Sequence, residues 1–180
     1  MARSKPTAKD AIALLKADHR EVEELFAQFE KARDDERKQE IAAKICNALK
    51  IHATIEEEIF YPAFIEASDD VDIHHEAEIE HRGAKNLIAE IEACSPDDDY
   101  FAPTVKVLSE MIKHHVKEEE KPDGMFSVAR ESKMDLVALG EELAARKAEL
   151  ESGDGEDMDT PPPGVGEKSG RVDRLMKETR

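Results

Sequence analysis

Apolar residues return along this chain at alternating steps of three and four positions, the spacing of one face of an α-helix. Four stretches carry the pattern, with stripes over residues 7–31, 41–59, 72–93 and 101–119. Short polar connections separate the stretches, at residues 34–37, 68–70 and 95–99. Because short connections favour antiparallel neighbours, the pattern predicts an all-α, antiparallel up-and-down four-helix bundle.

Three features of the sequence are expected to set the ends of these elements. Thr7 is suited to cap the first helix, and Pro62 is expected to kink or end the second. A further helical pattern over 125–150 predicts an additional C-terminal helix that packs on the bundle. From residue 151 the chain turns acidic and rich in Gly and Pro, so we expect one domain over 8–150 and a disordered tail over 151–180.

Each of the four stripes contains a histidine at a core position. These residues are His19, His52, His81 and His115. A buried imidazole without a partner costs about 1–3 kcal/mol, so four of them in one core call for an explanation. The alternative is a set of separate core histidines, but one on every facing stripe predicts a shared metal site.

Two of these histidines are followed by a carboxylate one helical turn later. Residues at i and i+4 share a face, so His52 with Glu56 and His115 with Glu119 each present a nitrogen and an oxygen to one site. Both glutamates lie in acidic runs that could instead be solvated, and Glu120 is the fallback for Glu119. Mixed imidazole and carboxylate ligation favours iron, with manganese second.

Composition argues against two classes of partner, nucleic acids and membranes. The net charge of −17 would repel nucleic acid and anionic lipid, and no apolar stretch approaches the roughly 20 residues of a membrane span. The N-terminus lacks the apolar run of a signal peptide, so we expect a cytoplasmic protein. Cys46 and Cys94 are too far apart in the sequence for a paired zinc or redox motif, and no protein partner is indicated.

Taken together, several motifs resemble the hemerythrin-like, or HHE cation-binding, domain proteins of bacteria over roughly residues 8–150. The motifs are Asp18-His19, His52 with the run EEEIFYP at 56–62, Glu80-His81, and His114-His115 with Glu118-Glu119-Glu120 and Met125-Phe126. The resemblance implies a non-haem di-iron centre held by His19, His52, Glu56, His81, His115 and Glu119. It also implies that Glu56 and Glu119 are bridging ligands.

The chain departs from the oxygen carriers of that family in two places. They have a second histidine one turn from the third-helix ligand, whereas the positions four residues from His81 are Ala77 and Lys85. The insertion at 121–124 leaves the register beyond Glu120 open. We therefore expect binding or sensing of oxygen or a related small oxidant, or iron handling, with a diatomic or peroxide ligand. The alternatives are a di-iron oxidoreductase acting on peroxide or nitric oxide, and a metal-dependent regulatory protein.

Other residues near these motifs carry weaker expectations. His74 and His75 are expected at the surface, and His114 at the surface or beside a ligand. Glu23 could orient a ligand. Phe60 and Tyr61 are expected to wall the site, with the Tyr61 hydroxyl available to a bound oxygen species.

Overall fold

The computed structural model describes residues 10–68 and 70–153, and within these residues it contains helices and no strand. The elements, in chain order, are α1 (Ala11–Lys31), α2 (Asp35–Ile55), the π-helical turn η1 (Glu56–Phe60), α3 (Tyr61–Ala67), α4 (Val71–Ala93), α5 (Phe101–Glu120), α6 (Met125–Glu131) and α7 (Leu136–Ser152).

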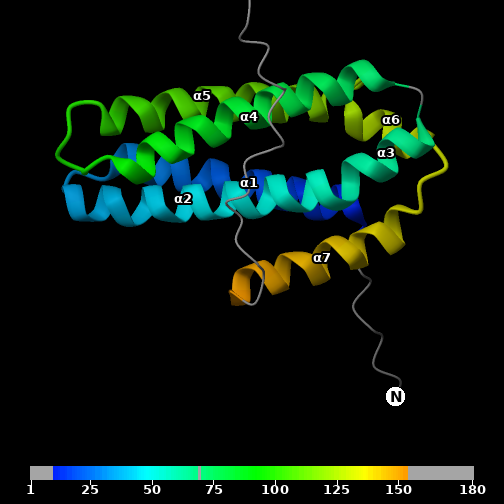
Figure 1. Cartoon of the computed structure of the whole chain (residues 1–180), viewed down its shortest axis with the longest axis horizontal. Coiled ribbons are helices and arrows are strands. Elements are labelled where there is room, and N and C mark those ends of the chain that lie inside the picture. The colour runs from blue at the N-terminus through cyan, green and yellow to red at the C-terminus, as the bar shows by residue number, and fades with distance from the viewer. Residues whose placement is uncertain (1–9, 69, 154–180) are drawn as a thin grey trace, which may run out of the picture.

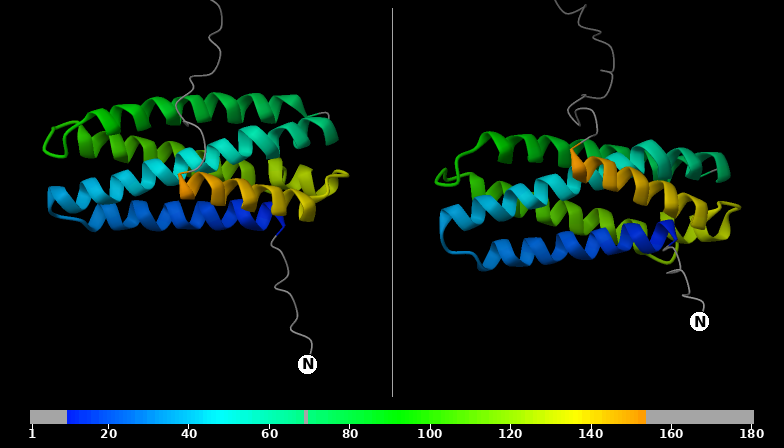
Figure 2. Two further views of the ribbon diagram at one scale, coloured as in Figure 1. Left: turned by 60° about the horizontal axis from the view of Figure 1, so that its bottom comes forward. Right: turned by 90° about the horizontal axis from the view of Figure 1, so that it is seen from below.

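Four long rods form an antiparallel bundle: α1, α2 with its continuation through η1 into α3, α4, and α5 (Figure 1). The last helix, α7, lies outside this bundle against α1, α2 and η1, as the turned views also show (Figure 2). The expected all-α bundle with an added C-terminal helix is therefore confirmed. The expected tail over 151–180 lies almost wholly outside the described residues.

Aspartates in the turns begin several helices. The Asp10 carboxylate accepts a hydrogen bond from the Ala13 amide at 2.7 Å, and Asp34 accepts one from the Arg37 amide at 2.8 Å. Such bonds satisfy amides that have no partner in the first turn. The predicted cap, Thr7, lies outside the described residues.

Two predicted boundaries differ in the structure. Pro62 does not end its helix: the chain widens into the π-turn just before it, where the Tyr61 amide bonds the Glu56 carbonyl, and continues to Ala67. The regular α-helical hydrogen bonding is thus interrupted beside Pro62, although the rod itself does not end there. The predicted single helix over 125–150 is two, α6 and α7, because Asp135 caps a new helix through the Ala138 amide.

The core consists of two apolar clusters with a polar layer between them. One cluster includes Val22, Leu49, Ala84 and Ile112 and lies toward the end of the bundle that carries the α1–α2 and α4–α5 connections. The other includes Leu15, Ile55, Ala77 and Met125 and lies near α6. All four predicted core histidines fall between these clusters. None of the described helices is both long and apolar enough to span a bilayer.

Candidate metal centre

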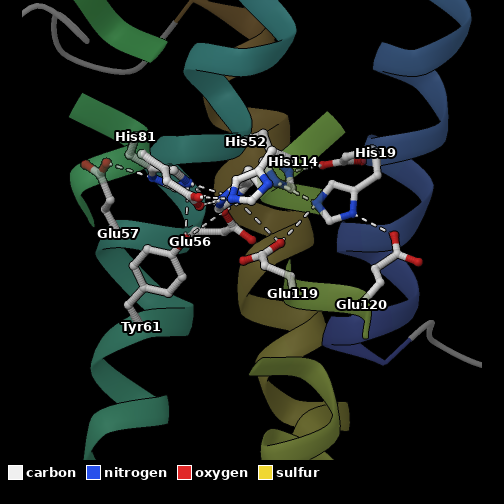
Figure 3. A network of polar contacts seen from close by, with 12 residues as sticks. His19, His52, Glu56, Glu57, Tyr61, His81, His114, Glu119 and Glu120 are labelled. Carbon is white, nitrogen blue, oxygen red and sulfur yellow. Dashed lines mark hydrogen bonds and ion pairs between the residues drawn. The ribbon is translucent and has the colours of Figure 1, made fainter. Parts of the chain in front are cut away.

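The four histidines meet at the middle of the bundle with their Nε2 atoms close together. Figure 3 shows three of them, His19, His52 and His81, together with Glu56 and Glu119. His19 Nε2 lies 3.2 Å from His52 Nε2, and His81 Nε2 lies 3.3 Å from His115 Nε2. Two donors about 2.1 Å from one ion are about 3.0–3.4 Å apart when their bond angle is close to or somewhat above a right angle. The imidazoles thus form two pairs, each at the spacing of two ligands of one ion.

Glu56 and Glu119 join these two pairs. Glu56 Oε2 lies 3.3 Å from His52 Nε2 and 3.4 Å from His81 Nε2. Glu119 Oε2 lies 3.3 Å from His19 Nε2 and 3.6 Å from His115 Nε2. Each carboxylate therefore contacts one imidazole of each pair, which is the placement of a bridging ligand.

The donor atoms fall into two groups that could each hold an ion: His19, His52, Glu56 and Glu119 in one, and Glu56, His81 and His115 in the other. All six residues are buried. Glu56 Oε1 and both oxygens of Glu119 accept no hydrogen bond although they are buried. An uncompensated buried carboxylate is costly, and metal ligation would remove that cost, so the residues fit a pair of cations.

Each ring also directs its Nδ1 atom at a carboxylate outside the centre. His19 faces Glu120 at 2.9 Å, His81 faces Glu57 at 3.0 Å, His115 faces Glu80 at 2.8 Å, and His52 faces Asp18 at 3.5 Å. Partners of this kind fix the tautomer of a ligating histidine and raise its basicity. Hydrogen bonds of this kind orient His19, His81 and His115 with Nε2 toward the centre, whereas His52 and Asp18 are in longer contact.

These outer carboxylates are sequence neighbours of the inner ligands. Asp18 precedes His19 and Glu80 precedes His81, while Glu57 follows Glu56 and Glu120 follows Glu119. The pattern recurs in both halves of the bundle, with 33 residues between the first two histidines and 34 between the last two. Sequence reasoning did not assign these four positions this role, although an acidic residue beside four of the six inner ligands was a usable signal.

The electrostatics of the site favour protonated histidines when no cation is present. Burial lowers the pKa of His19, but the nearby Glu119 carboxylate outweighs burial and raises this pKa to about 9. Burial likewise lowers the pKa of His81, and Glu56 and Glu57 raise it to about 9. Burial raises the pKa of Glu56, but the neighbouring histidines hold it far below its ordinary range. The site therefore attracts positive charge.

Aromatic rings close the centre on the α3 and α6 side. The Tyr61 hydroxyl lies 3.1 Å from His81 Nε2 and 3.3 Å from Glu56 Oε2, and Phe126 stacks on His19 with ring centroids 5.7 Å apart. Burial and the charge of Glu56 raise the pKa of Tyr61 well above its ordinary value, so its hydroxyl keeps its proton. Tyr61 thus faces the centre, as expected.

His74 was predicted at the surface, and this prediction is wrong. It is 9% exposed and packs edge-on against the Tyr61 ring, with centroids 5.4 Å apart. It lies two turns before His81 on the inward face of α4, so the same periodicity buries both residues. His75 and His114 are exposed, as expected, and Glu23 pairs with Arg20 at the surface rather than with a ligand.

The choice between Glu119 and Glu120 follows from the end of α5. Glu119 points into the centre, and Glu120 turns outward to His19 Nδ1, Lys16 and Arg20. The inserted turn then packs Gly124 on α5 so closely that a Cβ there would meet the Glu118 carbonyl oxygen at 2.2 Å. This close approach brings Phe126 back onto His19.

Hollows lie on both sides of the histidine layer. Toward the end of the bundle that carries the α1–α2 and α4–α5 connections, a cavity of about 30 Å³ is lined by the four histidines. The rest of its wall consists mostly of apolar atoms, from side chains such as Val22, Ala84 and Ile112. On the α6 side, a cleft of about 470 Å³ between α4, α5 and α6 reaches His115 and Glu119. The centre is therefore bordered by an apolar cavity on one side and by a charged cleft on the other.

Comparisons with known proteins agree with this geometry. A crystal structure of a hemerythrin HHE cation-binding domain-containing protein from Mycobacterium kansasii superposes with a TM-score of 0.70 at 23% identity, covering 81% of this chain and 89% of that one. A curated protein from Nostoc sp., described as a DNA nickase, is 30% identical over 110 residues. The match spans 59% of this chain but only 30% of the Nostoc protein. The sequence model of the hemerythrin HHE cation-binding domain matches residues 10–123, more than half of the chain, and the protein therefore belongs to that family.

Proposed function

We propose that this protein holds a dinuclear non-haem iron centre that binds dioxygen or a related small oxidant. The observation that carries the proposal is the complete double shell: four Nε2 atoms and two joining carboxylates inside, and four carboxylates on the Nδ1 atoms outside. Structural core histidines need partners but need no second, converging set of unpaired carboxylate oxygens.

Each ion would take two imidazoles and a share of two carboxylates. His19 and His52 serve one ion, His81 and His115 the other, and Glu56 and Glu119 bridge. This mixed donor set suits iron, and manganese second, better than calcium or structural zinc. The second group offers one donor fewer than the first, so an ion held there would have room for an external ligand.

The small cavity favours a diatomic or peroxide ligand. Its volume of about 30 Å³ compares with the space of a single water molecule, and its wall is mostly apolar beyond the histidines. A neutral diatomic molecule loses little on entering such a space, whereas an ion or a larger substrate would be excluded. When bound, the iron pair would supply electrons to that ligand.

The test is metal analysis followed by spectroscopy. Protein purified without oxygen should contain about two irons per chain, and admitting air should produce a charge-transfer absorption band. Reversal of the band on removing oxygen supports binding or sensing, whereas irreversible conversion points to turnover of peroxide or nitric oxide. His114→Ala, at an exposed position outside the six ligands, is the matched control for His81→Ala, which should lose metal. Less than one metal ion of any kind per chain would contradict the proposal.

A second candidate, metal-dependent regulation, is favoured by one chain of contacts. Lys147 on α7 binds Asp18 at 2.7 Å, and Asp18 faces His52. Metal occupancy could therefore change how firmly α7 is held. Hydrogen exchange in α7 should then differ between the metal-free, reduced and oxidised protein, and identical exchange in all three would exclude this function.

The contact between Lys147 and Asp18 also gives a prediction about the affinity for metal. Lys147→Met should weaken metal binding by about 3- to 10-fold, because Asp18 loses the partner that fixes it against His52. Arg146→Met is the control, since Arg146 pairs with the exposed Glu58 and touches no ligand partner. Competition against a chelator measures both, and equal affinities would show that α7 does not support the centre.

DNA cleavage, named for the Nostoc relative, is not part of this proposal. The aligned segment is 30% of that protein, and a net charge of −17 opposes contact with phosphates.

A further inference from the structure

The cleft on the α6 side of the histidine layer differs in character from the apolar cavity. It has a volume of about 470 Å³ and is open to solvent between α4, α5 and the start of α6. Its inner end is formed by His115 and Glu119, and Ala77, one turn before His81, lines it. A small side chain at this position leaves the centre accessible from the cleft.

The charged groups around this cleft are mostly acidic. Glu76, Glu80 and Glu118 line it, and Lys121 is the cation among its described lining residues. Lys121 is paired with Glu118 at 2.6 Å, which leaves Glu76 and Glu80 uncompensated by a lysine or arginine in the cleft. A concave surface with an excess of one charge raises the local concentration of the opposite charge.

Donor atoms lead from the mouth of the cleft to the centre. His114 is 65% exposed at the side chain, and its Nε2 lies 3.4 Å from Glu80 Oε1. The other oxygen of Glu80 contacts His115. At the inner end lies Glu119, which is 3% exposed and whose two oxygens accept no hydrogen bond. A buried carboxylate without hydrogen-bond partners at the end of an acidic cleft is an independent sign that a cation arrives there.

We propose that this cleft is the route by which divalent cations reach the centre, with His114 and Glu80 as a transient binding station at its mouth. The inference rests on the metal centre proposed above. A partly hydrated divalent cation needs oxygen and nitrogen donors and room for its waters, and the cleft supplies both. A neutral oxidant gains nothing from the acidic rim, and the apolar cavity across the histidine layer suits it better. Metal and oxidant would therefore approach the centre from opposite sides.

The experiment measures the rate of metal uptake, which does not depend on activity. Metal-free protein is mixed with Co²⁺ under anaerobic conditions and low salt, and the cobalt absorption bands are followed by stopped flow. A variant with Glu76→Gln, Glu118→Gln and His114→Gln should take up cobalt about 10-fold more slowly and still reach the wild-type stoichiometry, because the six ligands of the centre are unchanged. Raising the salt concentration should reduce the difference by screening.

The matched control removes the same two negative charges elsewhere. Glu141 and Glu142 are exposed on α7, away from the cleft, and neither forms an ion pair with any residue of 10–68 or 70–153. The variant Glu141→Gln with Glu142→Gln should take up cobalt at the wild-type rate. A rate equally slow in this control would overturn the proposal, since net charge alone would then explain the effect.

A second measurement separates the two routes. The reaction of oxygen with iron-loaded, reduced protein should proceed at the same rate in the cleft variant and the wild type. If oxygen reacts more slowly while cobalt uptake is unchanged, the cleft serves the oxidant and the proposal is wrong. If the wild type binds no metal, the proposed function itself fails. If the wild type and all variants take up metal fully and at the same rate, the proposed access route is wrong but the proposed function stands.

Discussion

Three consecutive glutamates have three different roles at the residue scale. Glu56 points into the centre, Glu57 contacts His81 Nδ1 and Lys85, and Glu58 pairs with Arg146 on α7. Successive residues of a helical turn point in different directions, so neighbouring residues reach different surroundings. Chemical type alone does not distinguish these residues.

Glu57→Gln should weaken metal binding by about 10-fold, because the charge that raises the basicity of His81 is removed while a hydrogen-bond acceptor remains. Chelator competition measures the affinity. Glu58→Gln is the control with the same chemical change one position along and should keep the wild-type affinity. Equal affinity in the Glu57 variant would contradict its positioning role.

Tyr61→Phe should leave the metal content unchanged and shorten the lifetime of a bound small ligand. The hydroxyl lies among the ligand atoms of the His81 ion, and a hydrogen bond to a charged group contributes about 1.5–3 kcal/mol. Its loss should accelerate dissociation of nitric oxide by about 10- to 100-fold in stopped-flow measurements. An unchanged dissociation rate would show that Tyr61 only packs against the site.

At the scale of elements, the turn between α5 and α6 fixes the wall of the centre. Gly124→Ala should lower the free energy of unfolding by about 3 kcal/mol. The new Cβ would overlap the backbone carbonyl oxygens of Glu118 and Glu119, which are part of α5 and cannot move without the helix. Gly83→Ala is the matched control: its Cβ meets the flexible end of Met111 at 3.2 Å, and alanine favours a helix by about 0.5–1 kcal/mol. Urea denaturation distinguishes the two, and equal stabilities would contradict the close packing of this turn.

At the scale of the whole molecule, protons and metal ions compete for the same buried histidines and glutamates. The pKa values of His19 and His81 are raised from 6.5 to about 9, so their protonation stabilises the metal-free fold fully below pH 6.5. That contribution is lost as the pH rises through about 9. Thermal unfolding of metal-free protein should therefore show a falling midpoint between pH 6.5 and 9.

Metal loading should consequently release about two protons per chain at pH 7, because ligating imidazoles must be neutral. A pH indicator in weakly buffered solution measures the release. Metal affinity should rise with pH up to about 9 and then level off. Loading without proton release would show that these histidines are already neutral.

The helices and the four inward histidines were predictable because both depend on local periodicity. A stripe with period 3.6 shows which residues share a face, and the steps from Leu15 to His19 and from Ile112 to His115 follow that rule. His74 was placed at the surface because it lies close to the start of its helix, although its spacing from His81 fits the inward face. Its burial depends on Tyr61, which reaches α4 from the segment after the π-turn.

The sequence by itself determined an all-α bundle with an imidazole on each seam and a carboxylate one turn after two of them, because helical spacing carries that information. Only the tertiary structure decided which acid of each run faces the centre, since a single-residue rotation exchanges them. It also decided that Lys147 supports Asp18 across 129 residues and that an acidic cleft opens beside Ala77. These features arise where separate helices meet, and no local spacing encodes such contacts.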